Sequence, residues 1–327
     1  MTSPLTQGSL ATIFGGSGFA GRYTVRKLAR NGWRVRAAVR RPDLAGYLQP
    51  MGAVGQVHAV QANVRYPESL ELAVNGSDLV VNFVAILAAS GQQTYHSVHV
   101  DGARAVARAA KNANVKQFVH ISALGADRNS PSYFGRTRAL GEEAVLEEFP
   151  EAVILRPAII FGPEDYFYNM LARLTLYSPF LPLIAGGKTR FQPIYVGDLA
   201  NAVLATIQDK KHYGKIYEIG GPDIFTFRQI LDCIQLWTGR RRIYVPIPLW
   251  LTKLQAIITM PFPNALRALT LDQALMFEVN NVVNEEAVLE RRTLSDLGVK
   301  QQQSSLAIVP GYLEHYRVNG QFSRYIS

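Results

Sequence analysis

The sequence is poor in cysteine and has no long apolar run. Cys233 is the single cysteine, so no disulfide can form within the chain, which is typical of a reducing compartment. We expect it to be a buried helical residue, because no neighbour would stabilise a thiolate. A membrane-spanning helix needs about 18 consecutive apolar residues. We expect none here, because the most apolar stretch, 243–262, is interrupted by Pro246, Pro248, Lys253 and Pro261.

Acidic residues are scarce at the start of the chain, where none precedes Asp43. The basic residues before it are Arg22, Arg26, Lys27, Arg30, Arg34, Arg36, Arg40 and Arg41. The whole chain has a net charge of +9 and a pI near 9.6. Such a surface favours anionic partners: phosphates, acidic protein faces or the headgroups of an anionic membrane leaflet. Nucleic acid is not an expected partner, because no DNA- or RNA-binding module is recognisable.

Alternating strand and helix patterns in the first half predict a parallel sheet covered by helices on both faces. Apolar runs predict strands at 10–14, 34–39, 57–61, 79–86, 117–122 and 152–157. Helical patterns follow the first strand up to about residue 31, follow Pro67, and recur at 95–112 and 132–149. We therefore predict the α/β class, with a doubly wound parallel sheet of the Rossmann type.

The second half is less regular, with a predicted strand at 216–219 and predicted helices at 227–238 and 249–260. We expect residues 1–160 to form a nucleotide-binding domain. Residues 161–327 should form a smaller C-terminal lobe, partly interleaved with the main sheet and ending in a docking tail. Residues 1–8 are too short and too polar for a signal or transit peptide. We therefore expect a bacterial cytoplasmic protein or a mature organellar one.

A glycine-rich turn follows the first predicted strand and opens the first helix. Gly15, Gly18 and Gly21 have the spacing G-x-x-G-x-x-G. Without side chains, the backbone can turn tightly and approach a pyrophosphate, whose charge the N–H groups of the helix terminus hold. The alternative is a tight strand–helix turn without a ligand, but the position at the start of the chain favours dinucleotide binding.

The end of the second predicted strand indicates which dinucleotide binds. NAD-binding proteins place an acid there for the ribose 2′-hydroxyl, whereas this chain has Arg40 and Arg41. Guanidinium groups pair with a 2′-phosphate, so the pattern favours NADP(H) over NAD(H). The alternative is that both arginines are solvated surface charges.

Further candidate residues stand at the ends of later strands. Asn63 and Val64 follow the third strand, where an adenine would lie, although an ordinary loop asparagine is an open alternative. Val84 and Ala85 would flank the nicotinamide side, and Ser122 could donate to a substrate carbonyl or be structural. The predicted cofactor site comprises Gly15, Gly18, Phe19, Gly21, Arg40, Arg41, Asn63, Val64, Val84, Ala85, Ser122, Arg138 and Pro157.

The helix at 132–149 lacks an acid/base pair. A hydride-transferring short-chain dehydrogenase would have a Tyr there, with a Lys four residues later; this chain has Phe134 and Arg138. Phe has no hydroxyl to give or take a proton. Tyr133 is one residue away, about 100° around a helix, so we expect it to face elsewhere. Arg138 can still bond a cofactor ribose, but it cannot copy the geometry of Lys.

Three other features have a simpler explanation beside a functional one. His96 and His99 have a spacing that metals use, but no further ligand completes a site, so we predict no metal. Arg240, Arg241 and Arg242 form a solvated turn or contact an acidic partner or lipid headgroup. The apolar segment 249–258, with Trp250, is a buried helix or docks to a membrane surface or a partner.

The chain resembles the extended, atypical short-chain dehydrogenases through its glycine turn, Arg40–Arg41, segment 120–126 and Arg156–Pro157. It is most similar to the dehydrogenase-like accessory subunit of respiratory complex I, of the alpha-subcomplex subunit nine type, in its alphaproteobacterial form. The segments that carry this closer similarity are 98–104, 136–142, 192–198, 280–283, 292–298 and 320–322.

The resemblance implies a non-catalytic accessory subunit of the NADH:ubiquinone oxidoreductase with a tightly bound, structural NADPH. It also implies docking to other complex I subunits of the hydrophilic arm and membrane junction, near the region where quinone enters. The expected location is peripheral, on the cytoplasmic face of the bacterial inner membrane. Two alternatives stay open: an NADP-dependent reductase or epimerase that uses Ser122 on a sugar or lipid-like substrate, and a regulator that senses NADPH.

Overall fold

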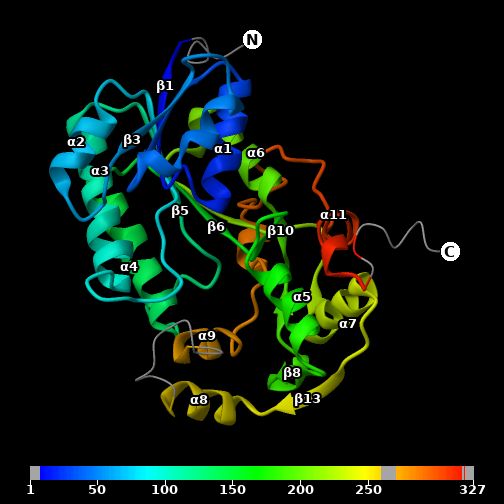
Figure 1. The fold of residues 1–327 in the computed structure, drawn as a ribbon. Helices are drawn as coiled ribbons and strands as arrows, with labels where there is room; N and C mark the ends of the chain where they lie inside the picture. Colours follow the sequence, from blue (N-terminus) through cyan, green and yellow to red (C-terminus); the bar gives the residue numbers. More distant parts are fainter. Residues whose placement is uncertain (1–7, 259–269, 319, 321–327) are drawn as a thin grey trace. The chain divides into compact units, whose positions relative to one another are not determined.

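The computed structural model describes residues 8–258, 270–318 and 320 (Figure 1). The chain divides into two compact units. The first comprises Met1–Pro157, Gly197–Ile219 and Glu285–Lys300, and the second comprises Ala158–Val196, Gly220–Asn284 and Gln301–Ser327. The chain therefore returns twice to the first unit after residue 157.

The first unit is built on a seven-stranded parallel sheet with the order β11-β6-β5-β4-β1-β2-β3. Its strands are β1 (Leu10–Phe14), β2 (Arg34–Val39), β3 (Val57–Gln61), β4 (Leu79–Asn82), β5 (Gln117–Ile121), β6 (Val153–Pro157) and β11 (Ile216–Ile219). The strand order reverses between β1 and β4, which is where ligands bind in doubly wound sheets. The predicted fold class is confirmed.

Helices cover both faces of this sheet. Their bounds are α1 (Phe19–Arg30), α2 (Pro67–Val74), α3 (Gly102–Asn112), α4 (Tyr133–Glu148), α6 (Val196–Thr206) and α10 (Glu285–Leu289). Short 3-10 turns are η1 (Pro42–Leu44), η2 (Gly46–Met51) and η5 (Lys210–His212). Figure 1 shows α2, α3 and α4 on one side of the sheet and α1 on the other.

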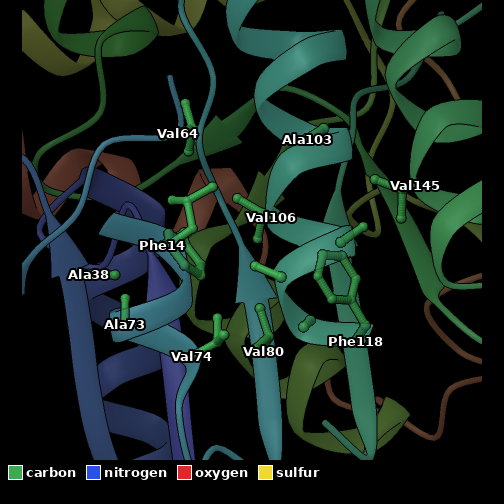
Figure 2. Close-up of a cluster of buried hydrophobic side chains, with 14 of the residues drawn as sticks. Phe14, Ala38, Val64, Ala73, Val74, Val80, Ala103, Val106, Phe118 and Val145 are labelled. Carbon is green, nitrogen blue, oxygen red and sulfur yellow. The ribbon is translucent and has the colours of Figure 1, made fainter. Parts of the chain in front are cut away.

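The core between the sheet and α2, α3 and α4 consists of small and branched side chains (Figure 2). Val80 and Phe118 of the sheet meet Val106 of α3 and Val145 of α4. Alanines line the buried face of α3, and this allows the helix backbone to approach the strands closely. This face of the sheet is thereby buried, and the central strands β4 and β5 are buried along their whole length.

Two predicted elements of the first unit differ from the structure. The fourth strand ends at Asn82 rather than Ile86, because the Asn82 side chain accepts a hydrogen bond from the Val84 amide at 3.0 Å and turns the chain. The helix predicted at 95–112 begins with a π-helical turn, η3 (Ser97–Asp101), before α3. Glycine at position 141 of α4 permits this turn, since a Cβ there would lie 2.1 Å from the carbonyl oxygen of His99.

The second unit has three small two-stranded sheets and several helices. Its strands are β7 (Ile160–Phe161), β8 (Phe180–Ile184), β9 (Arg190–Phe191), β10 (Ile194–Tyr195), β12 (Phe225–Thr226) and β13 (Ile243–Ile247). Its helices are α5 (Phe167–Tyr177), α7 (Phe227–Thr238), α8 (Leu249–Ile258), α9 (Leu271–Met276) and α11 (Ser305–Tyr312), with 3-10 turns η4 (Ala185–Gly187) and η7 (Glu314–Tyr316). An aromatic core joins α5, α7 and α11.

Local signals define α7, which has the predicted bounds. Thr226 and Gln229 form a capping box at its start, and Gly239 ends it with a φ of +67°. Cys233 lies on this helix but is only half-buried, and burial raises the pKa of its thiol. The docking tail expected at the C-terminus and the end of the helix predicted at 249–260 lie outside the described residues. Among the described helices, none is both long enough and apolar enough to cross a membrane.

Candidate dinucleotide-binding site

The predicted cofactor residues all belong to the first unit, and most stand at the carboxyl ends of its strands. Gly15 follows β1, Arg40 follows β2, and Ser122 follows β5. Asn63 and Val64 come after β3, Val84 and Ala85 come after β4, and Pro157 ends β6. Because all these strands are parallel, the tertiary structure brings residues from distant parts of the sequence to one edge of the sheet.

The glycine turn is built around the backbone of Gly15. Gly15 has a φ of +75°, a conformation that favours glycine. Its N–H donates to the carbonyl of Ala38 at 3.0 Å, which ties the turn to β2. A Cβ at this position would lie 3.4–3.5 Å from the backbone of Phe83 and Val84. The turn therefore lies against the chain that leaves β4, at the point where the strand order reverses.

The other two glycines of the motif have different reasons to be glycine. A Cβ on Gly21 would lie 2.2 Å from the carbonyl oxygen of Gly15, so the close packing of α1 on the turn requires glycine. Gly18 is exposed, has a φ of −71°, and its Cβ would meet one atom, the Gly15 oxygen at 3.1 Å. Neither backbone conformation nor packing strictly requires glycine at position 18. Its backbone, without a side chain at the start of α1, allows a phosphate to approach. Phe19 follows as the first residue of α1.

Arg40 and Arg41 are both exposed at the end of β2. The Nη1 of Arg40 donates to the Gln93 side chain at 2.9 Å. Arg41 forms an ion pair with Asp43, Nη2 to Oδ2, at 3.0 Å. The two arginines thus differ, since Arg41 pairs with a carboxylate at the surface whereas Arg40 contacts a neutral amide.

Asn63 and Val64 stabilise the loop in which they lie, through hydrogen bonds and core packing. The Oδ1 of Asn63 accepts a hydrogen bond from the Arg65 amide at 3.2 Å. The Asn63 amide donates to the Ser69 hydroxyl at 3.0 Å. The Val64 side chain is buried in the core against α3 (Figure 2). Any contact of Val64 with a nucleotide would therefore have to come from its backbone.

Near the end of β5, the side chains of Ser122 and Arg138 have buried polar atoms for which the described residues provide no hydrogen-bond partner. The Nη2 of Arg138 donates to the carbonyl of Ile121 at 2.5 Å. Within the described ranges, the Oγ of Ser122 and the Nε and Nη1 of Arg138 find no hydrogen-bond partner. Buried polar atoms are rarely left unpaired in a finished structure. Burial lowers the pKa of Arg138 to about 10, so it stays charged at neutral pH.

Phe134 and Tyr133, in the first turn of α4, differ in burial, although both rings contact the Tyr95 ring. Phe134 is buried, and its ring meets the His99 ring edge to face at 5.4 Å and the Tyr95 ring at 6.2 Å. Tyr133 is 43% exposed. An aromatic ring without a hydroxyl thus occupies the buried position four residues before Arg138.

Both ring nitrogens of His99 take part in a row of buried hydrogen bonds. Its Nε2 accepts from the Ile86 amide at 3.1 Å, so the ring proton lies on Nδ1, which donates to Thr137 at 3.0 Å. The Thr137 hydroxyl donates in turn to the Tyr133 carbonyl at 2.9 Å. Burial and the charge of Arg138 lower the pKa of His99 to about 3. His99 is therefore neutral and is not available as a base.

His120 continues this buried polar layer. The Asn82 amide donates to its Nδ1 at 3.3 Å, which leaves its Nε2 with no acceptor among the residues that the structure describes. Burial, followed by the charge of Arg138, holds the pKa of His120 well below its usual range. Sequence reasoning missed this layer, because the side chains come from four separate elements, η3, α4, β4 and β5.

The remaining candidates have ordinary partners. His96 is exposed and pairs with Asp101 at 3.1 Å, whereas His99 is buried, so the two histidines do not converge. Arg242 donates to the Thr175 carbonyl at 2.9 Å and Arg240 donates to the Tyr316 carbonyl at 3.1 Å. In α8, Trp250, Leu251 and Leu254 are exposed.

Comparisons with known proteins agree with this geometry. A protein-family model with the description NAD(P)H-binding matches residues 15–152. The mitochondrial NADH dehydrogenase (ubiquinone) 1 alpha subcomplex subunit 9 of Arabidopsis thaliana is 34% identical over 295 residues, covering 86% of this chain and 72% of the relative. A ceramide reductase of Caulobacter vibrioides is 33% identical over 196 residues, covering 60% of each chain.

Among solved structures, a dTDP-glucose 4,6-dehydratase of Streptomyces venezuelae has the same fold. Its TM-score is 0.71 at 17% identity, and the match covers 95% of this chain and 97% of that chain. The chain thus carries an NAD(P)H-binding domain of the doubly wound type. On the extent and identity of its curated relatives, the chain belongs to the family of the NADH dehydrogenase (ubiquinone) 1 alpha subcomplex subunit 9.

Proposed function

We propose that this chain is a non-catalytic accessory subunit of the respiratory NADH:ubiquinone oxidoreductase that holds a dinucleotide for structural reasons. The observation that carries the proposal is the similarity to subunit 9 relatives over 86% of the chain. These relatives are named as subunits of that enzyme, and the similarity extends well beyond the dinucleotide-binding residues 15–152. The part of the chain outside that range then has the task of contacting other subunits.

The dinucleotide of this proposal is NADPH, bound tightly. The glycine turn and the start of α1 hold its pyrophosphate, and Arg40 holds the 2′-phosphate, with Arg41 beside it. Support comes from the exposed guanidinium of Arg40, whose neighbour is an amide and not a carboxylate. The loop at Asn63 and Val64 lies at the carboxyl end of β3, on the adenine side of the sheet.

The absence of turnover in this proposal follows from the buried residues of α4. Proton transfer needs a group that can give and take a proton near neutral pH. Phe134 has no such group, Arg138 stays charged, and the hydrogen bonds of His99 keep it neutral. Tyr133 is 43% exposed, and its ring packs edge to face against Tyr95 at 5.9 Å. The nicotinamide chemistry that the cofactor can supply would therefore find no acid/base pair at the positions of Phe134 and Arg138.

The partners in this proposal are complex I subunits of the hydrophilic arm and membrane junction. In this proposal the protein is peripheral to the membrane and lies on the cytoplasmic face of the bacterial inner membrane. Support comes from the net charge of +9 and from the exposed apolar side chains of α8, which suit a protein face or anionic headgroups near a membrane.

Native size fractionation of gently solubilised membranes tests the proposal. The distribution of this chain is followed together with NADH:quinone activity, and bound nucleotide is extracted from the same fractions. We expect the chain, NADPH and activity to migrate together in one large particle. Migration of the chain as a small species, separate from the activity, would refute the accessory-subunit role.

A second candidate is an NADP-dependent reductase, which the similarity to a ceramide reductase and the unpaired Ser122 hydroxyl favour. Ser122 would then donate a hydrogen bond to a substrate carbonyl. This candidate requires substrate-dependent oxidation of NADPH by the purified chain, lost in Ser122→Ala. A screen of lipid and sugar ketones without any such oxidation would remove its support.

A further inference from the structure

Two side chains hold the glycine turn from its outer side. The Tyr47 hydroxyl donates to the carbonyl oxygen of Ser17 at 2.5 Å. Arg22 reaches the same oxygen with Nη2 at 3.4 Å and the Gly18 oxygen with Nε at 3.3 Å. The Cζ of Arg22 also lies 5.2 Å from the centre of the Tyr47 ring, a cation–π distance. Tyr47, Arg22 and the turn thus form one connected group.

These contacts orient the peptide between Ser17 and Gly18 at both ends. Its carbonyl points to Tyr47 and Arg22, while its N–H donates to the Gly15 carbonyl at 2.9 Å. Because a peptide is planar, its orientation is then set. A carbonyl turned toward a pyrophosphate would repel the phosphate oxygens, whereas the free N–H groups of the first helical turn attract them.

Core packing does not explain the position of Tyr47, whose side chain is 42% exposed. It belongs to η2, in the segment that follows Arg40 and Arg41. Its hydroxyl therefore joins the connection after β2 to the turn after β1. These are the two segments that the proposed function assigns to the phosphates of the dinucleotide.

We propose that Tyr47 and Arg22 are positioning residues for the dinucleotide: they keep the Ser17 carbonyl away from the pyrophosphate and so raise the affinity of the turn. The inference rests on the proposed dinucleotide binding, which assigned no role to either residue. Its signature is a common effect on both dinucleotides. A residue that acts through the turn changes the affinity for NADPH and NADH by the same factor, because both carry the pyrophosphate. A ligand of the 2′-phosphate changes only NADPH binding.

The experiment uses the full chain freed of nucleotide and titrates NADPH and NADH separately by fluorescence. Tyr47→Phe keeps the ring over Arg22 and removes the hydrogen bond, so we expect both Kd values to rise about three- to tenfold, as for one hydrogen bond. Arg22→Met should raise both Kd values further, and Arg22→Lys should fall between, since an ammonium cannot span the two carbonyls. The Kd ratio of NADH to NADPH should not change.

Tyr177→Phe is the matched control, because this tyrosine is 81% exposed in the second unit and its change should leave both Kd values as they are. Unchanged Kd values in Tyr47→Phe, or weaker binding of NADPH alone in the Arg22 variants, would overturn the inference. If Arg22→Met does not fold, the Kd values of Tyr47→Phe and Arg22→Lys for the two dinucleotides still test the inference. If the unmodified chain binds neither dinucleotide, the cofactor part of the proposed function fails as well, which distinguishes the two failures.

Discussion

The guanidinium of Arg138 lies over the ring of Phe134, with its Cζ 5.8 Å from the ring centre. The two residues that stand where an acid/base pair would be thus contact each other as a cation and an aromatic face. The arrangement gives Phe134 a packing role, since the same ring also meets His99 and Tyr95. It follows that this part of α4 contributes to stability.

The packing role of Phe134 predicts a clear contrast with its neighbour. We expect Phe134→Leu to lower the free energy of unfolding by about 2–3 kcal/mol, through lost ring contacts and a partly filled space. Tyr133→Leu should cost less, because Tyr133 is 43% exposed. Urea denaturation of both variants measures the difference. Equal losses would show that the two rings contribute alike and would contradict the prediction.

The arginines after β2 predict a change in nucleotide content. Arg40→Glu should lower the affinity for NADPH at least about tenfold, because an acid replaces attraction of the 2′-phosphate by repulsion. Arg41→Glu should have a smaller effect, since Arg41 already pairs with Asp43. Nucleotide extracted from the purified variants is quantified, with Arg30→Glu on α1 as control. Normal NADPH in Arg40→Glu, with an intact far-UV CD spectrum, would contradict the assignment.

A buried ion pair predicts an asymmetric loss of stability. The Nε and Nη2 of Arg156 contact the two oxygens of Glu142 at 2.9 and 2.7 Å, and Glu142 is 2% exposed. Arg156→Met should cost about 3–5 kcal/mol, because it leaves a buried carboxylate with its partner removed. Glu142→Gln should cost less, since the amide oxygen still accepts from Arg156. Thermal unfolding at neutral pH compares them, and the reverse order would contradict the prediction.

The neutral state of His99 predicts acid sensitivity. Its pKa is about 3 in the folded chain, below the value of about 6.5 expected when unfolded. Below about pH 6.5, His99 therefore binds a proton in the unfolded state but not in the folded state. The free energy of unfolding falls as the pH falls toward 3. At pH 5 the His99 contribution amounts to a loss of about 2 kcal/mol.

Denaturation at pH 7.5 and pH 5 tests this coupling. His99→Gln keeps an acceptor for Ile86 and a donor for Thr137 but cannot titrate, so its stability should change less between the two pH values. His58→Gln, which removes an exposed imidazole, serves as control. An identical pH dependence in His99→Gln and the unmodified chain would show that His99 does not contribute.

Local sequence patterns predicted much of the first unit. Strands β1, β2 and β3 have the predicted bounds, because each has apolar residues that pack in the sheet and ends near a turn signal or a loop. Helix α7 also has its predicted bounds, because its capping box and final glycine act within a few residues. The glycine turn could be predicted for the same reason, since its backbone conformation depends on neighbours in the chain.

Contacts between distant residues could not be predicted in this way. The π-helical turn before α3 and the bond of His99 to Thr137 depend on packing against α4. The bond from Tyr47 to Ser17 has no sequence signature, because no periodicity links a 3-10 turn to a loop that far away.

The sequence by itself thus determined the parallel sheet, the glycine turn, the arginines after β2 and the absence of Tyr and Lys from α4. These features follow from residue type and short-range spacing. Only the tertiary structure decided which side chain Arg40 contacts, which ring is buried beneath Arg138, and which side chains hold the turn. These features depend on distances between elements, which the packing of the core sets.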